Sequence, residues 1–223
     1  MGNKLLFLII AILIIISGVF FIFQFQKGRI SIIKETSMPE LLDENSKKAA
    51  VLIAFRNFRD EEYFVPKEIL ESGGVKVVTV STQEGIAIGA DGGDVKIDLT
   101  LDKLNIEDYA AIIFIGGPGA LDYLDNEDSY RIVRETIKQN KILAAICIAP
   151  TILARSGALE GKKATVWASP LDKSSIKTLR ENRVEFIEKA VVQDGSIITA
   201  NGPAAAKEFG EKIIDTIKEL TGK

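Results

Sequence analysis

The distribution of hydrophobic positions divides the chain into three parts. Residues 5–23 are almost continuously apolar, and the stretch that follows is mixed and polar with no sustained period. From residue 49 onward, short apolar runs alternate with amphipathic segments. We therefore expect three units along the chain, residues 1–26, 27–47 and 48–223, each with a different role.

The first unit is expected to be a transmembrane anchor. A helix through residues 5–23 rises ~1.5 Å per residue and is about 28 Å long, close to the ~30 Å hydrocarbon core of a bilayer. A cleaved signal peptide has a shorter apolar core and a small-residue cleavage site, whereas this run continues into FFIFQFQKG. We expect an uncleaved single-pass anchor, followed by a polar tether. The basic residues after the span favour a cytoplasmic domain by the positive-inside rule, whereas the secretory-like start favours the opposite side, so the side of the soluble domain is left open.

The third unit has the alternating pattern of an α/β domain. Strands are expected at residues 49–55, 75–82, 110–115, 142–146, 164–168 and 184–187, with a pair of strands within 190–200, and helices at 61–72, 126–139, 149–156 and 203–220. The segments IAIGA and DVKIDL flank Asp91-Gly92-Gly93 and predict a hairpin. Trp167, the only tryptophan, is expected in the core. Continuous apolar strands between helices are typical of a mostly parallel sheet covered on both faces.

Composition excludes several kinds of site. The chain is 47% hydrophobic and 26% charged, with a net charge of −3 and no dense basic patch, which argues against nucleic acid as a partner. It has no histidine, so no imidazole base is available within the chain. One cysteine and no histidine cannot supply the usual ligands of zinc. We expect no metal and no cofactor.

Cys147, the only cysteine, lies between the strand-like run 142–146 and a helix-like stretch that contains Pro150. At the start of a helix, a thiol experiences the positive end of the helix dipole and unpaired backbone N–H groups. Such surroundings lower the pKa of a cysteine and favour the nucleophilic thiolate. An unpaired cysteine is also often a small buried residue without chemistry. The local sequence permits both interpretations.

A glycine-rich loop, Gly116-Gly117-Pro118-Gly119, follows the strand-like run 110–115. It lacks the lysine and Ser/Thr of a phosphate-binding loop and the spacing of a dinucleotide fingerprint. Glycines allow a backbone N–H to approach a reactive atom closely, as an oxyanion site requires. A tight strand-to-helix turn would need the same residues.

Three acidic residues, Asp60, Glu61 and Glu62, lie near the start of the expected helix 61–72. Acidic residues in this position usually interact favourably with the helix dipole. A carboxyl group that points back towards the strand ends would instead be desolvated and close to a thiolate. Both effects raise its pKa, so that it could stay protonated and donate a hydrogen bond to sulfur.

Together, GGPGA after a strand, AAIC at a strand-to-helix turn and E-x-x-x-P after the first strand resemble the ThiJ/PfpI family of the class I glutamine amidotransferase-like superfamily. The resemblance also includes GKKATVWASPL and ITANGPAAAKEFG, and it extends from about residue 47 to 220. It implies a flavodoxin-like three-layer sandwich and assembly into dimers or hexamers. It further implies that Cys147 is the elbow nucleophile, that Glu62 hydrogen-bonds the thiol, and that backbone N–H groups of the Gly116-Gly117 loop and of Ile148 form an oxyanion site.

The chain departs from this family at two positions. Protease-like members have histidine directly after the cysteine, where this chain has Ile148, and deglycase-like members have histidine before the proline, where it has Ser169 before Pro170. General acid–base help typically contributes ~10²–10⁴ in rate. Efficient peptidase activity is therefore not expected, because an amide is a poor electrophile. A reactive carbonyl such as an α-oxoaldehyde needs less help.

Two functions follow from this reading. In the first, the protein is a cysteine-dependent enzyme of the glyoxalase, deglycase or hydrolase type that acts on a small molecule. In the second, it is a membrane-tethered redox-responsive or binding module whose thiol oxidises reversibly. The missing histidines favour the second function, and the combination of Cys147, Glu62 and the glycine loop favours the first.

Overall fold

The computed structural model describes residues 48–221. The expected anchor, residues 1–26, and the expected tether, residues 27–47, lie outside this range. Within it, none of the helices combines the length and the apolar character needed to cross a bilayer.

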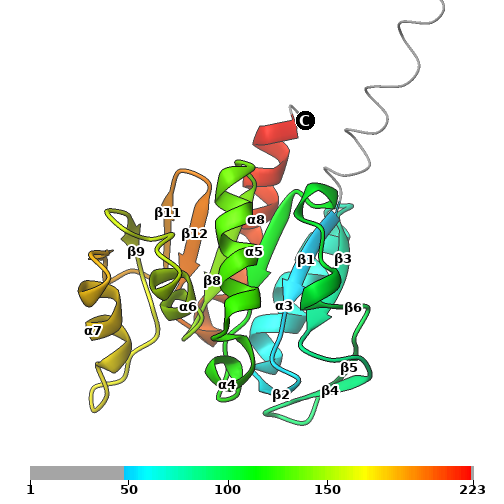
Figure 1. The fold of residues 1–223 in the computed structure, drawn as a ribbon, viewed down its shortest axis with the longest axis horizontal. Helices are drawn as coiled ribbons and strands as arrows, with labels where there is room; N and C mark the ends of the chain where they lie inside the picture. Colours follow the sequence, from blue (N-terminus) through cyan, green and yellow to red (C-terminus); the bar gives the residue numbers. More distant parts are fainter. Residues whose placement is uncertain (1–47, 222–223) are drawn as a thin grey trace, which may run out of the picture. The chain divides into compact units, whose positions relative to one another are not determined.

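The largest sheet among the described residues has seven strands in the order β11-β12-β8-β7-β1-β3-β6 (Figure 1). The strands are β1 (Lys48–Leu52), β3 (Lys76–Ser81), β6 (Leu99–Thr100), β7 (Ala111–Phe114), β8 (Ile142–Ile146), β11 (Val191–Asp194) and β12 (Ile197–Ala200). All neighbouring pairs are parallel except β11–β12, which is antiparallel. The predicted, mostly parallel sheet is confirmed.

The strands of this sheet are buried on both faces. Ala49 and Val51 of β1 belong to one hydrophobic core, and Ala50 and Leu52 belong to another. Helices α3 (Asp60–Ser72) and α8 (Ala206–Thr221) contribute to the first core, and α5 (Glu127–Lys138) and α6 (Pro150–Arg155) contribute to the second. The continuous apolar strands predicted a sheet covered on both faces, and the family resemblance implied this three-layer, flavodoxin-like arrangement.

The remaining elements are short. They are β2 (Arg56–Phe58), β4 (Ile86–Gly89), β5 (Asp94–Lys96), β9 (Lys163–Ala164), β10 (Glu185–Phe186), α4 (Ala120–Leu124), α7 (Ser174–Glu181), and the 3-10 turns η1 (Leu101–Lys103), η2 (Ile106–Asp108) and η3 (Pro203–Ala205). Strands β2, β4 and β5 form a small separate sheet, and β9 pairs with β10.

The predicted hairpin is formed by β4 and β5, which are antiparallel. Its tip is attached to the first turn of α3, because the Asp60 carboxylate accepts hydrogen bonds from the N–H of Asp91 at 2.8 Å and of Gly93 at 2.6 Å. A Cβ at Gly89 or Gly93 would overlap this carboxylate, so the small residues allow the close approach. The hairpin is thereby fixed beside the start of α3.

The segment 164–168 differs from its prediction as a strand. Only Lys163–Ala164 forms a strand, β9, and residues 165–169 have no regular secondary structure. The N–H of Thr165 donates to Oγ1 of Thr199 at 3.0 Å, and the N–H of Trp167 donates to the carbonyl of Cys147 at 2.8 Å. The prediction that Trp167 lies in the core is wrong, since the residue is 38% exposed.

The strand order creates a crevice at the carboxyl ends of β1 and β7. Strand β1 lies between β3 and β7, so the chain leaves β1 towards β3 on one side and later enters β7 on the other. In open α/β sheets, ligands bind outside the carboxyl ends of the strands at such a switch point. Residues after β1, β7, β8 and β12 meet there.

Candidate active site

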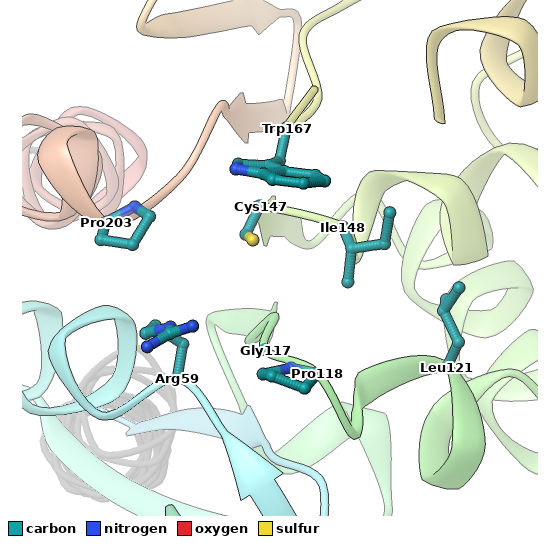
Figure 2. Close-up of a pocket in the computed structure, with 8 residues that line it drawn as sticks. All are labelled: Arg59, Gly117, Pro118, Leu121, Cys147, Ile148, Trp167 and Pro203. Atoms are coloured by element: carbon teal, nitrogen blue, oxygen red, sulfur yellow. The ribbon is translucent and has the colours of Figure 1, made fainter. Parts of the chain in front are cut away.

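A cavity of about 280 Å³ lies at this switch point (Figure 2). Each segment that follows a strand supplies part of its lining: Arg59 precedes α3, Gly117 and Pro118 follow β7, Leu121 belongs to α4, and Cys147 and Ile148 follow β8. Trp167 and Pro203 complete the lining. The structure therefore brings the glycine loop and the cysteine turn together.

Cys147 has a backbone conformation that is rare for a residue with a side chain. Its φ is +63°, in the left-handed region. Two hydrogen bonds hold it there: its N–H donates to the carbonyl of Ala200 at 2.9 Å, and its carbonyl accepts from the N–H of Trp167 at 2.8 Å. Such strain persists only where the surroundings over-determine it, and it is common at functional sites. In Figure 2 the sulfur points into the cavity.

Glu62 projects from the first turn of α3 into the protein interior, next to Cys147. Its side chain is fully buried, and Oε2 accepts a hydrogen bond from the N–H of Gly116 at 3.2 Å. Oε1 is buried without a regular hydrogen-bond partner among residues 48–221. The carboxyl nevertheless interacts with the Cys147 thiol strongly enough to affect the pKa of both groups. The carboxyl group of Glu62 and the thiol of Cys147 therefore interact directly.

The glycine at position 116 makes this arrangement possible. A Cβ there would lie 2.5 Å from Cβ of Cys147 and 2.8 Å from Oε2 of Glu62. Any side chain would therefore separate the carboxyl from the thiol or displace one of them. Gly116 was predicted as part of the oxyanion site, but its N–H is directed to Glu62.

The protonation of the pair differs in part from what the sequence predicts. Burial raises the pKa of the Glu62 carboxyl from 4.5 to about 7, as expected for a desolvated acid. Burial also raises the pKa of the Cys147 thiol, and the adjacent Glu62 carboxylate raises it further, to about 12. The net lowering expected at the start of a helix is not found, because burial and the Glu62 carboxylate outweigh the effect of the nearby backbone N–H groups. The resting pair is a thiol beside a carboxyl group that titrates near neutral pH.

Two backbone N–H groups are directed at the sulfur. Those of Gly117 and Ile148 hydrogen-bond Cys147 and act to lower the pKa of its thiol. These are the two donors that the family resemblance implied for an oxyanion site. An oxygen bonded to a carbon on this sulfur would lie within reach of donors already in place, as electrostatic stabilisation of an anion requires.

Gly117 fixes the glycine loop against the segment before α3. Its φ is +113°, and a Cβ there would lie 2.3 Å from the backbone N of Arg59 and 2.6 Å from the carbonyl O of Asn57. The N–H of Arg59 donates to the carbonyl of Gly116 at 3.1 Å. The loop after β7 and the start of α3 are therefore in direct backbone contact, which sets the position of Glu62 relative to Cys147.

Sequence reasoning missed four residues of the cavity lining, Arg59, Leu121, Trp167 and Pro203. Arg59 immediately precedes the acidic run that contains Glu62, and its guanidinium pairs with Asp91 on the hairpin at 3.2 Å. In Figure 2 the Trp167 indole lies on the Cys147 side of the cavity and Arg59 on the opposite side. The position of Arg59 next to a predicted site residue was the one available signal, whereas nothing local marks Trp167.

Other predicted positions lie outside the cavity lining. Glu61 is exposed on α3. Ser169, at the position where the family resemblance implies a histidine in deglycase-like members, forms a local turn in which its Oγ accepts from the N–H of Asp172 at 3.0 Å. Within residues 48–221, no three histidine, cysteine or acidic residues are grouped so that they could hold a metal ion.

Comparison with known proteins places this chain in a family. The model of the DJ-1/PfpI family matches residues 47–216. A protein of Methanocaldococcus jannaschii described only as uncharacterised is 40% identical over 179 residues, which cover 79% of this chain and 86% of that protein. A protein of Pyrococcus horikoshii named as a deglycase is 29% identical, with 75% of this chain and 98% of that protein covered.

Solved structures agree with this assignment. The crystal structure of a ThiJ/PfpI domain protein from Brachyspira murdochii superposes with a TM-score of 0.74 at 29% identity, covering 78% of this chain and 98% of that one. With the site geometry and the sequence match over residues 47–216 in agreement, the chain belongs to the DJ-1/PfpI family.

Proposed function

We propose that the protein is a membrane-anchored, cysteine-dependent enzyme that acts on small reactive carbonyl compounds, in the manner of a glyoxalase or deglycase. The observation that supports this most directly is the buried Glu62 carboxyl beside the Cys147 thiol, with the N–H groups of Gly117 and Ile148 directed at the sulfur. The relatives named as deglycases support the same class of reaction.

The reaction begins with addition of the thiol to an aldehyde. The sulfur of Cys147 bonds to the carbonyl carbon while its proton passes to the Glu62 carboxylate, and the π electrons move onto oxygen. That oxygen, next to the N–H groups of Gly117 and Ile148, takes the proton back from Glu62 and gives a hemithioacetal. A carboxyl group with a pKa of about 7 suits both transfers, because it can gain and lose a proton near neutral pH.

For methylglyoxal, the remaining steps need no oxidant or reductant. Glu62 removes the proton from carbon 1 and a proton returns to carbon 2, so the hemithioacetal becomes a thioester through an enediol. Water then hydrolyses the thioester to lactate and restores the thiol. A peptide bond requires protonation of a poor leaving group, which this histidine-free site is not equipped to provide.

The test is methylglyoxal consumption and lactate formation by the full chain in detergent micelles. Wild type should form lactate, and Cys147→Ser should form none. Glu62→Gln should lower the rate by ~10²–10⁴, the usual contribution of a proton-transfer group. Glu61→Gln, the neighbouring exposed acid on α3, should remain close to wild type and is the matched control. A fluorogenic peptide should not be cleaved.

The result that contradicts the proposal is an absence of lactate at all substrate concentrations in a folded wild-type protein. If such a protein forms a sulfenic acid at Cys147 with mild peroxide and a thiol reductant restores it, the redox-responsive function replaces the enzymatic one. Equal rates in wild type and Cys147→Ser would exclude both functions.

Membrane attachment is the second part of the proposal, and it rests on the apolar run of residues 5–23. The full chain should stay with membranes during carbonate or high-salt extraction. The fragment 48–223 should be released as a soluble, folded protein, because both hydrophobic cores lie within residues 48–221. Release of the full chain by salt alone would contradict the anchor.

A further inference from the structure

The cavity beside Cys147 has an uneven charge distribution. Among the described residues, Arg59 is the one charged side chain in its lining. The other side chains that face it are largely apolar, contributed by Pro118, Leu121, Ile148 and Trp167. A small molecule in this cavity therefore meets one cation and several hydrocarbon surfaces.

The backbone of Arg59 is fixed while its guanidinium remains available. The N–H of Arg59 donates to the carbonyl of Gly116 at 3.1 Å, which attaches the residue to the glycine loop. The guanidinium Nη1 lies 3.2 Å from both carboxylate oxygens of Asp91. The two side chains are 33% and 57% exposed, and ion pairs so exposed to solvent are weak. An incoming anion can therefore replace Asp91 as the partner of Arg59.

The positive charge of Arg59 also reaches the reacting groups. It opposes the effect of burial on the pKa of the Glu62 carboxyl, so its field extends to the acid–thiol pair. Figure 2 shows Arg59 facing Cys147 across the cavity, with Gly117 and Pro118 on the same side as the arginine. A molecule that reaches from one side to the other touches both the guanidinium and the sulfur.

We propose that Arg59 binds the anionic group of the substrate, so that the site prefers small aldehydes and ketones that carry a carboxylate over neutral carbonyl compounds. A planar guanidinium suits this task because it binds carboxylates through two parallel hydrogen bonds. The sulfur of Cys147 then adds to the carbonyl carbon of the bound anion, while the thiol proton passes through Glu62 to the carbonyl oxygen. This inference rests on the proposed function, and it concerns which substrates the same site selects.

The first test compares two alkylating reagents that differ in charge. Iodoacetate and iodoacetamide have nearly the same size, and both form a bond to the sulfur with loss of iodide. Their rate ratio at Cys147, measured on the full chain in detergent micelles, cancels any change in the fraction of thiolate. Arg59→Gln should lower the ratio of iodoacetate to iodoacetamide by ~3–10-fold, as expected for loss of one nearby charge. Arg59→Lys should retain most of the ratio.

The structure supplies a variant with the opposite expected effect and a matched control. Asp91→Asn removes the competing carboxylate and should raise the ratio, and the hairpin tip should stay in place because Asp60 holds the N–H of Asp91 and Gly93. Lys67 lies on α3, outside the cavity lining, where it pairs with Glu71. Lys67→Gln removes this cation and should leave the ratio unchanged. Added salt should lower the ratio in wild type but not in Arg59→Gln.

A second measurement uses a carbonyl compound itself. Glyoxylate should protect Cys147 from iodoacetamide at a lower concentration than glycolaldehyde, a neutral aldehyde of similar size, and Arg59→Gln should abolish this difference. An unchanged reagent ratio and unchanged protection in Arg59→Gln would overturn the inference. That outcome would leave lactate formation from methylglyoxal untouched, whereas a chain that forms no lactate but keeps the Arg59-dependent ratio contradicts only the proposed function.

Discussion

The inner and outer halves of the candidate active site are built in opposite ways. The inner half, Glu62, Gly116 and Cys147, is buried or half-buried, and a Cβ at Gly116 would overlap both of its neighbours. The outer half consists of Arg59 and Trp167, which line the cavity, and Asp91, which pairs with Arg59; these side chains are partly or largely exposed to solvent. Reactive groups are thus fixed by packing, and the groups that meet an approaching molecule are held by weak interactions.

This difference indicates which properties a substitution can change separately. A change in the inner half alters stability and chemistry together, because the same atoms provide packing, hydrogen bonds and reactivity. A change in the outer half alters the choice of ligand at little cost in stability. The predictions below test that separation, beginning with the largest effect on the free energy of unfolding, measured by denaturant on residues 48–223.

The largest loss is expected for Gly117→Ala. Its Cβ would lie 2.3 Å from the backbone N of Arg59, and backbone atoms cannot move aside as the end of a flexible side chain can. We expect a loss of ~3 kcal/mol or more, the range of severe overpacking and backbone strain. Gly157→Ala is the control, since its φ is also positive, at +86°, but its Cβ would meet open space. It should cost only ~1 kcal/mol, and equal losses would show that contact at Gly117 does not matter.

The next effect is the pH dependence caused by Glu62. The pKa of this carboxyl is about 7 in the folded protein against an ordinary value of 4.5, so the folded state binds more protons between these values. Its contribution is fully present below pH 4.5 and is lost as the pH rises through 7, a total of ~3 kcal/mol. Glu62→Gln should flatten stability across this window, and Glu61→Gln should preserve the slope. A slope that survives in Glu62→Gln would contradict the assignment.

A smaller effect is expected where the two halves join. Asp60→Ala removes the acceptor that holds the N–H of Asp91 and of Gly93, and it should cost ~1–2 kcal/mol. Amide hydrogen exchange at these two positions should accelerate, which separates loss of the hairpin attachment from a general loss of helix stability. Glu61→Ala in the same helical turn should leave their exchange unchanged.

The smallest effect on stability is expected for Asp91→Asn. Its ion pair with Arg59 is exposed, and such pairs contribute ~0–1 kcal/mol. The free energy of unfolding should therefore stay within ~0.5 kcal/mol of wild type, although the same change is expected to raise the preference for anionic reagents. A large destabilisation would show that the outer half also supports the fold, and the contrast between the halves would be lost.

The architecture could be predicted because its signals are local. Residues 110–115 and 142–146 are continuous apolar runs, which are typical of strands buried on both faces. Helix α5 begins after Asn126, whose side chain accepts from the N–H of Ser129 at 3.0 Å, so its start follows from a capping residue in the sequence. The hairpin around residues 91–93 could also be predicted from local sequence, because its glycines indicate a turn between two strands.

The site was predictable only in part because its remaining features depend on tertiary contacts. The direction of the thiol pKa was wrong, since it depends on the depth of burial and on the charge of Glu62, which no local pattern reveals. Trp167 was assigned to the core because a lone tryptophan between apolar residues usually lies there. Its exposure follows from the backbone hydrogen bond to the Cys147 carbonyl, a contact between residues far apart in sequence.

The hydrogen bond between the Trp167 N–H and the Cys147 carbonyl also gives the protein an intrinsic fluorescent probe. Trp167 is the only tryptophan in the chain, and its indole lines the cavity into which the Cys147 sulfur points. The tryptophan fluorescence of the protein therefore comes entirely from the edge of the reactive site. Alkylation, oxidation or adduct formation at the sulfur changes the polarity and quenching around that one fluorophore, so each step can be followed in real time without any label.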